Sequence, residues 1–288
     1  MPQHSADLAN ISVLAAFAHP DDEGFGPGGT LAMLADRGAA LTLICATNGD
    51  VGEISDPVLA TTETLAQVRQ EELRAAMAVT GVQDVRFLGY RDSGMQGTPD
   101  NNDPSSLYQA PAEQVTRRLV DIIRELRPDV VMTHDPTGGY GHPDHVTVYQ
   151  RVTEAFEMAS DPEWRQAGQA VNPEPWSPGL LYYVCFPRSN FQRLWRYMVD
   201  NGIEPPFASL EADKIGSPDE AVTTSVDVSA YVETKLASLA CHRTQMNAQG
   251  AFAQLPEELT REIMSTEYFT LAVSQGGSAG VDLLANLG

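Results

Sequence analysis

The stretch "ISVLAAFAHPDDEGFGPGGTLAMLADRGAALTLICAT" (residues 11–47) decides the fold. It begins with a continuous apolar run at residues 11–18, which is typical of a strand buried on both faces of a parallel sheet. A helical pattern with Gly38 near its end follows over residues 28–39, and a second apolar run occupies residues 41–47. The stretch therefore predicts a strand, a crossing helix and a second parallel strand.

The same alternation continues along the chain. Helical patterns over about 62–80, 112–126 and 143–158 are interspersed with strand patterns at 85–90 and 129–134. Such an order is typical of a doubly wound, mainly parallel sheet with helices on both faces. We predict a Rossmann-like α/β fold with the strand order third, second, first, fourth. Its ligand site would lie at the carboxyl ends of the first and fourth strands.

A segment rich in Pro and Gly begins near residue 161. We place a domain boundary there, with a Rossmann-like core in residues 1–165 and a smaller C-terminal α+β lobe in residues 166–288 that completes the substrate pocket. The patterns in this lobe predict strands at 180–186 and 221–228 and helices at 191–202 and 229–245.

Charge and hydropathy argue against two classes of partner. The 288 residues include 39 Asp and Glu but only 18 Lys and Arg, and this formal charge of -21 would repel nucleic acid. No apolar run approaches the roughly 20 residues that span a bilayer, and the N-terminus lacks the features of a signal peptide. We therefore expect a cytoplasmic protein with a small-molecule partner and no membrane contact; a homo-oligomer stays open.

Two loops at the predicted strand ends concentrate ionisable residues. The first strand is followed by "HPDDE" (residues 19–23), and the fourth ends in "HDPTGGYGHPDH" (residues 134–145), so that these loops hold four of the six histidines. A single such residue is usually a helix cap or a satisfied polar group. Two loops with the same His-Pro-Asp step are better explained by a divalent cation. Two imidazoles and a carboxylate suit a zinc ion with one position left for water, and ferrous iron can use the same set.

Several motifs resemble those of one enzyme family. They are "AHPDDE" (18–23), "GDVGE" (49–53), "YRDSGM" (90–95), "GGYGHPDH" (138–145), "HRTQ" (242–245) and "GGSAG" (276–280). The chain resembles the PIG-L/LmbE superfamily of zinc-dependent N-acetylglucosaminyl deacetylases, and is most similar to the branch that contains the mycothiol-biosynthetic deacetylase and the mycothiol S-conjugate amidase.

The resemblance implies a role for each motif residue. The implied metal ligands are His19, Asp22 and His145, and Asp21 is the implied general base that takes a proton from the attacking water. Asp144 would orient and charge-stabilise His142, which would act near the tetrahedral intermediate, and Tyr140 would donate to the oxyanion. The implied sugar-binding residues are Glu53, Arg69, Asp92, Met95 and Gln245. His134 is interpreted as a strand-end residue, and Glu23 as a supporting acid.

The activity that follows from the resemblance is hydrolysis of the N-acetyl group of a GlcNAc-type glycoside, consistent with low-molecular-weight thiol synthesis. Three alternatives stay open: an amidase of thiol S-conjugates, a deacetylase of other N-acetylated sugars such as chitooligosaccharides, and a noncatalytic Rossmann-like binding module. Loss of Asp21 or of a metal ligand would mark the binding module, but the sequence retains them all.

Overall fold

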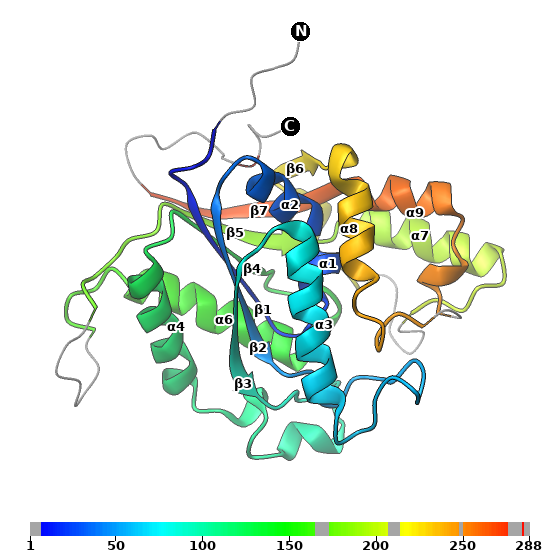
Figure 1. The fold of residues 1–288 in the computed structure, drawn as a ribbon, viewed down its shortest axis with the longest axis horizontal. Coiled ribbons are helices and arrows are strands. Elements are labelled where there is room, and N and C mark those ends of the chain that lie inside the picture. Colours follow the sequence, from blue (N-terminus) through cyan, green and yellow to red (C-terminus); the bar gives the residue numbers. More distant parts are fainter. Residues whose placement is uncertain (1–6, 165–172, 207–213, 248–249, 276–283, 285–288) are drawn as a thin grey trace, which may run out of the picture.

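A mainly parallel sheet of seven strands forms the centre of the protein, in the order β3-β2-β1-β4-β5-β7-β6 (Figure 1). The structure is a computed structural model and describes residues 7–164, 173–206, 214–247, 250–275 and 284. The strands are β1 (Ser12–Phe17), β2 (Ala40–Thr47), β3 (Asp84–Tyr90), β4 (Val130–His134), β5 (Leu180–Cys185), β6 (Thr224–Asp227) and β7 (Thr266–Ser274). The helices are α1 (Asp22–Phe25), α2 (Gly28–Asp36), α3 (Leu65–Thr80), α4 (Ala112–Leu126), α5 (Gly138–Gly141), α6 (Pro143–Met158), α7 (Arg188–Asp200), α8 (Val232–Leu239) and α9 (Glu257–Met264).

Strand order and direction place the two ionisable loops side by side. β1 pairs in parallel with both β2 and β4, β2 pairs in parallel with β3, and β4 pairs in parallel with β5. The predicted order of the first four strands is therefore confirmed. Because β1 and β4 are parallel neighbours, the loops that follow them emerge from the same edge of the sheet, where the order of connections reverses.

The two faces of β1 belong to two different cores. Val13, Ala15 and Phe17 pack in one cluster with apolar residues of α2 and α3, whereas Leu14 and Ala16 pack in another with residues of α4 and α6. Figure 1 shows α4 and α6 together on one side of the sheet, and α2, α3 and α8 on the other. Burial on both faces explains why this strand is apolar at every position after Ser12.

The C-terminal segment extends the same sheet. β7 pairs antiparallel with both β5 and β6, and the sequence patterns predicted neither β7 nor α9. The predicted domain boundary falls within residues 165–172, outside the described residues, and the division into two domains stays a prediction. Within the described residues, no helix is both long and apolar enough to cross a bilayer.

A buried ion pair fastens this C-terminal segment to the loop after β1. Lys235 Nζ of α8 donates to Glu267 Oε1 of β7 at 2.6 Å and to the carbonyl oxygen of Gly26 at 2.8 Å. The Glu267 carboxylate also accepts the backbone N–H groups of Gly29 and Thr30, each at 2.8 Å, in the first turn of α2. An acid at a helix N-terminus is stabilised by the unpaired N–H groups there, so the pair fixes the position of α2 and the loop before it.

Candidate metal centre and active site

The first loop makes a sharp turn directly after β1. Asp21, which precedes α1, has φ of 134°, a value that L residues rarely adopt. Its backbone N–H donates to Glu23 Oε2 at 3.0 Å. The turn carries His19, Asp21 and Asp22 into the space beyond the strand end.

The second loop ends in the first turn of α6. His142 is the residue before the helix, and its Nδ1 accepts the backbone N–H of Asp144 at 3.2 Å. Pro143 occupies the first helical position, where its fixed φ suits the helix and no N–H is needed. Asp144 and His145 follow in the same turn, so the helix start determines the positions of all three ionisable side chains.

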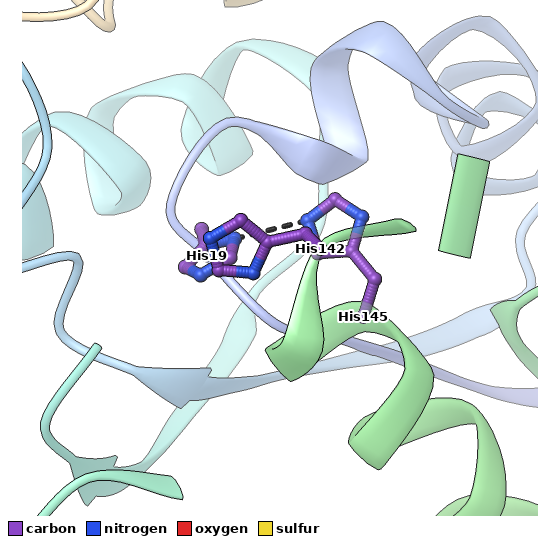
Figure 2. A group of neighbouring side chains, drawn as sticks. All are labelled: His19, His142 and His145. Atoms are coloured by element: carbon purple, nitrogen blue, oxygen red, sulfur yellow. Dashed lines mark hydrogen bonds between the residues drawn. The ribbon is translucent and has the colours of Figure 1, made fainter. Parts of the chain in front are cut away.

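Three side-chain atoms from these loops come together. His19 Nδ1 lies 3.0 Å from His145 Nε2, and Figure 2 shows these rings converging with that of His142. Asp22 places one oxygen 3.5 Å from His19 Nδ1 and the other 3.2 Å from His145 Nε2. The structure therefore brings together the three residues that were predicted as metal ligands.

Each of the two imidazoles uses its other ring nitrogen for a hydrogen bond. His145 Nδ1 lies 3.1 Å from the carbonyl oxygen of Gly138, and His19 Nε2 lies 3.2 Å from Asp144 Oδ2. Since a carbonyl or a carboxylate can only accept, these two nitrogens carry the protons. In the neutral rings, His19 Nδ1 and His145 Nε2 therefore face each other with lone pairs, an arrangement that a cation between them would stabilise.

The separations also suit a metal ion. A tetrahedral zinc with bonds of about 2.0–2.1 Å keeps its ligand atoms about 3.3 Å apart. The three separations here are 3.0, 3.5 and 3.2 Å.

Burial by itself lowers the pKa of His19, but Asp92, Asp144 and Asp22 outweigh it and raise the pKa well above its usual value. The surroundings thus favour positive charge.

Further side chains lie around this group. Among the described residues, three overlapping sets offer ligand atoms that all lie within 4.8 Å of one another: His19, His142 and His145; His19, Asp92, His142 and Asp144; and Asp22, His134 and His145. The predicted ligands His19, Asp22 and His145 are distributed over these sets and do not form one of them. In the last set, His134 Nε2 accepts the backbone N–H of Ala18 at 3.0 Å, which occupies its lone pair. We therefore do not count His134 among the ligands.

Asp21, the predicted base, lies beside the buried guanidinium of Arg69. Arg69 Nη2 is 3.1 Å from Asp21 Oδ2 and also donates to the carbonyl oxygen of Pro20 at 2.7 Å. The pKa of Asp21 is raised to about 6, chiefly because the carboxyl group is buried. Arg69 opposes this shift and Asp22 adds to it. A carboxylate with a pKa near neutrality is suited to accept and return a proton.

Asp144 was predicted to orient His142, but its carboxylate contacts other residues. The Asp144 carboxylate accepts from the backbone N–H and the hydroxyl of Ser93 and lies next to His19, while only its backbone N–H bonds to His142. Burial, together with His19 and His145, holds the pKa of His142 well below its usual range. His142 is therefore neutral, with its proton on Nε2 and available to donate.

Tyr140 lies next to these imidazoles. Its ring centroid is 5.1 Å from that of His145 and 6.0 Å from that of His142, in edge-on arrangements. Burial raises the pKa of its hydroxyl, so Tyr140 keeps its proton and can donate it in a hydrogen bond.

The predicted sugar-binding residues occupy two places. Gln245 Nε2 donates to the backbone oxygen of Glu53 at 2.9 Å, and a Cβ at Gly52 would lie 2.4 Å from Arg69 Nη1 and 2.9 Å from Gln245 Oε1, so these side chains are neighbours. Asp92 Oδ1 is 3.6 Å from His19 Nε2. Met95 is half-buried in the loop that continues from Asp92.

Four side chains at the site had no predicted role in it or only a supporting one. The ring of His134 stacks on that of His145 at 4.1 Å, although it was interpreted as a strand-end residue. Ser93 anchors Asp144, as described above, and His242 pairs with Glu23 at 2.7 Å. The position of His134 at the end of a strand on the ligand edge was a usable signal. Ser93, His242 and Glu23 each lie in one of the motifs named above, but no spacing in the sequence indicates the contacts that they make.

Comparison with known proteins adds to this geometry. The family model for PIG-L, described as GlcNAc-PI de-N-acetylase, matches residues 14–156. A 1D-myo-inositol 2-acetamido-2-deoxy-alpha-D-glucopyranoside deacetylase of Geodermatophilus obscurus is 39% identical over 93% of this chain and 94% of its own. The chain belongs to the PIG-L family. This confirms the resemblance that the motifs carried.

Further PIG-L proteins support the same relationship. A deacetylase of the same name from Thermobispora bispora is 38% identical, over 94% of this chain and 91% of its own. Among solved structures, the N,N'-diacetylchitobiose deacetylase of Pyrococcus horikoshii matches with a TM-score of 0.66 and 22% identity, over 91% of this chain and 84% of that one. At that identity the likeness supports the PIG-L fold alone.

Proposed function

We propose that the protein is a metal-dependent hydrolase that removes the N-acetyl group from a GlcNAc-type glycoside, releasing acetate and a free amine. The observation that carries this proposal is the meeting of His19 Nδ1, His145 Nε2 and the Asp22 carboxylate within 3.0–3.5 Å, with Asp21 in the same loop. The names of the PIG-L relatives indicate the substrate, an N-acetylglucosaminide of inositol.

The metal ion is proposed to be zinc, held by His19, Asp22 and His145. When bound, it would polarise the substrate carbonyl and make a water more acidic. Ferrous iron fits the same donor set. Gly138 and Asp144 hold the two imidazoles so that the nitrogens facing the ion carry no proton.

The proton is proposed to move through Asp21. Arg69 engages Asp21 Oδ2, which leaves Oδ1 to take a proton from the attacking water and return it to the departing amine nitrogen. His142 Nε2–H and the Tyr140 hydroxyl would donate to the oxygen on which negative charge develops. Arg69, Glu53, Gln245, Asp92 and Met95 would hold the sugar; Arg69 Nε is a buried donor with no partner among the described residues.

Acetate release from the inositol N-acetylglucosaminide tests this function with the zinc-loaded protein. Asp21→Asn should lower kcat by about a thousandfold, the loss typical of a missing general base, while one zinc per chain is retained. His145→Ala should lose both zinc and activity. The control is Asp7→Asn, an exposed acid that precedes β1, at the opposite end of that strand from the site. Full activity in Asp21→Asn would refute the proposed base, and no acetate release by the wild type would refute the function.

A further inference from the structure

A cavity of about 340 Å³ lies beside the predicted metal ligands. Asp21, Asp22, Tyr140 and His145 are part of its lining. The other walls come from the end of β5, α7, α9 and the start of β7, and we call it the α7–α9 cavity. Its apolar lining includes Phe25, Phe186, Phe191, Leu194, Ile263 and Met264.

The charged side chains of the α7–α9 cavity already have partners. Lys235 and Glu267 are both 2% exposed and pair with each other at 2.6 Å. Arg193 and Glu262 pair at 2.9 Å on the solvent-exposed side, joining α7 to α9. A ligand group in this cavity would thus meet mainly aromatic and aliphatic surface, which favours an apolar group.

The predicted sugar-binding residues lie elsewhere around the metal ligands. His19 turns Nδ1 toward Asp22 and His145, and Nε2 toward Asp92. Arg69 approaches Asp21 from the side of Gly49 and Gly52. None of the five predicted sugar-binding residues belongs to the described lining of the cavity.

An amide substrate would reach both regions at once. In a trans secondary amide, the substituent on nitrogen and the carbon chain of the acyl group point in opposite directions across the C–N bond. With the carbonyl at the metal ligands and the sugar beside Asp92 and Arg69, the acyl group is directed into the α7–α9 cavity.

The cavity is larger than an acetyl group requires. A water molecule takes about 30 Å³ of liquid volume, so 340 Å³ corresponds to roughly eleven such volumes. An acetyl group has three non-hydrogen atoms. Resting on the proposed deacetylase function, we propose that the α7–α9 cavity is the acyl subsite and that the enzyme also hydrolyses amino-sugar amides with apolar acyl groups of about six carbons.

The reaction balances as a hydrolysis. The oxygen of water bonds to the acyl carbon, the C–N bond breaks, and the nitrogen takes a proton to leave as the amine. The other product is a fatty carboxylate in place of acetate, and no further reactant is needed.

Turnover of an acyl series tests the acyl subsite. The zinc-loaded protein is assayed on one glucosaminide that carries an N-acetyl, N-butyryl or N-hexanoyl group, with amine release as the readout. We expect kcat/KM to rise about fourfold for each methylene that becomes buried. Hydrolysis of the N-acetyl form without hydrolysis of the N-hexanoyl form would overturn the acyl subsite but not the proposed function. No hydrolysis of any form would refute both.

A variant that fills the α7–α9 cavity tests whether the preference for longer acyl groups arises there. Leu194→Trp should lower the hexanoyl-to-acetyl ratio of kcat/KM by about tenfold, because the larger side chain occupies the space of the acyl chain. The matched control is Val199→Trp on the same helix, which is 56% exposed and lies outside the cavity lining. An unchanged ratio in Leu194→Trp would overturn the assignment.

Two further measurements, of aglycone sensitivity and of inhibition by carboxylates, also test the acyl subsite. An N-acetylglucosaminide with an octyl aglycone should not become more sensitive to Leu194→Trp than its methyl counterpart; greater sensitivity would place the aglycone in the cavity instead. If Leu194→Trp does not fold, inhibition of the wild type by carboxylates replaces it. Hexanoate should then inhibit at least tenfold more strongly than acetate, and equal inhibition would overturn the acyl subsite.

Discussion

His242 and Glu23 form a buried pair in which His242 Nε2 donates to Glu23 Oε1 across 2.7 Å. The second carboxylate oxygen of Glu23 accepts the backbone N–H of Asp21 at 3.0 Å. Asp21 has φ of 134°, a conformation that costs of order 1–3 kcal/mol and persists only where the surroundings enforce it. The pair therefore connects a residue of the C-terminal segment to the backbone of the proposed base.

The first prediction concerns this connection. Glu23→Ala should lower the free energy of unfolding by about 3 kcal/mol, because it leaves the buried imidazole of His242 without its carboxylate partner. It should also lower kcat more than it changes KM, since Asp21 loses its backbone anchor. Denaturant unfolding and steady-state kinetics measure both. Glu71→Ala, at an exposed position on α3, should stay within about 0.5 kcal/mol of the wild type. Wild-type kcat in Glu23→Ala would contradict the role of the anchor.

The second prediction concerns pH. Burial by itself lowers the pKa of His242, but Glu23 and Asp21 outweigh burial and the nearby Arg69, and the net effect raises it. A folded pKa above the unfolded value of about 6.5 gives stability that is fully present below pH 6.5 and lost as the pH rises through the folded pKa. The difference in unfolding free energy between the wild type and His242→Gln should therefore shrink above pH 6.5. Metal-free protein should be used, because zinc affinity itself depends on pH; a difference that grows with pH would contradict the raised pKa.

The parallel part of the fold could be predicted because its strands are buried on both faces. Residues 11–18 and 41–47 were predicted as strands from their apolar runs; β1 lies within the first run, and β2 covers the second and begins one residue before it. β7 has no such run: its burial alternates, and it carries Glu267 at a buried position where the acid is paired with Lys235. α9 has only eight residues, is rich in charge, and buries a single residue, Met264, which packs with Val232 and Leu239 of α8. Tertiary contacts decide such elements more than local pattern does.

The site could be predicted as far as its motifs and the sheet edge determine it. The equal His-Pro-Asp steps and the parallel pairing of β1 with β4 are enough to bring His19 and His145 together. Which nitrogen of each imidazole carries the proton, however, depends on hydrogen-bond acceptors. These are the carbonyl oxygen of Gly138 for His145 and the Asp144 carboxylate, held by Ser93, for His19. These contacts join residues whose types show no periodicity, so only the folded chain reveals them.

The third prediction separates the effect of backbone strain from the effect of contact with His145, a proposed metal ligand. Gly138 has φ of 63°, and a Cβ there would lie 3.0 Å from the Cβ of His145. Gly202 has φ of 71°, but a Cβ there would meet nothing within 4 Å. Both Gly138→Ala and Gly202→Ala should lose about 1 kcal/mol of stability through backbone strain. Only Gly138→Ala should also weaken zinc binding, by about tenfold, because it moves the acceptor of His145 Nδ1. Competition with a chromophoric chelator measures this, and equal zinc affinities of the two variants would contradict it.

The fourth prediction concerns the loop that carries Tyr140. The hydroxyl of Ser217 donates to Asp135 Oδ2, and the Gly216 N–H donates to the carbonyl oxygen of Gly139 at 2.7 Å, so the C-terminal segment holds this loop at two points. Ser217→Ala removes one of them and should lower kcat by about tenfold with little change in KM, as expected when a donor is misplaced only for the transition state. In a Tyr140→Phe background the same substitution should have almost no effect, because the hydroxyl that it positions is already absent. Ser189→Ala, which removes an exposed hydrogen bond to Asp219 in the same segment, should leave kcat unchanged. A tenfold loss that persists in the Tyr140→Phe background would show that Ser217 acts by another route.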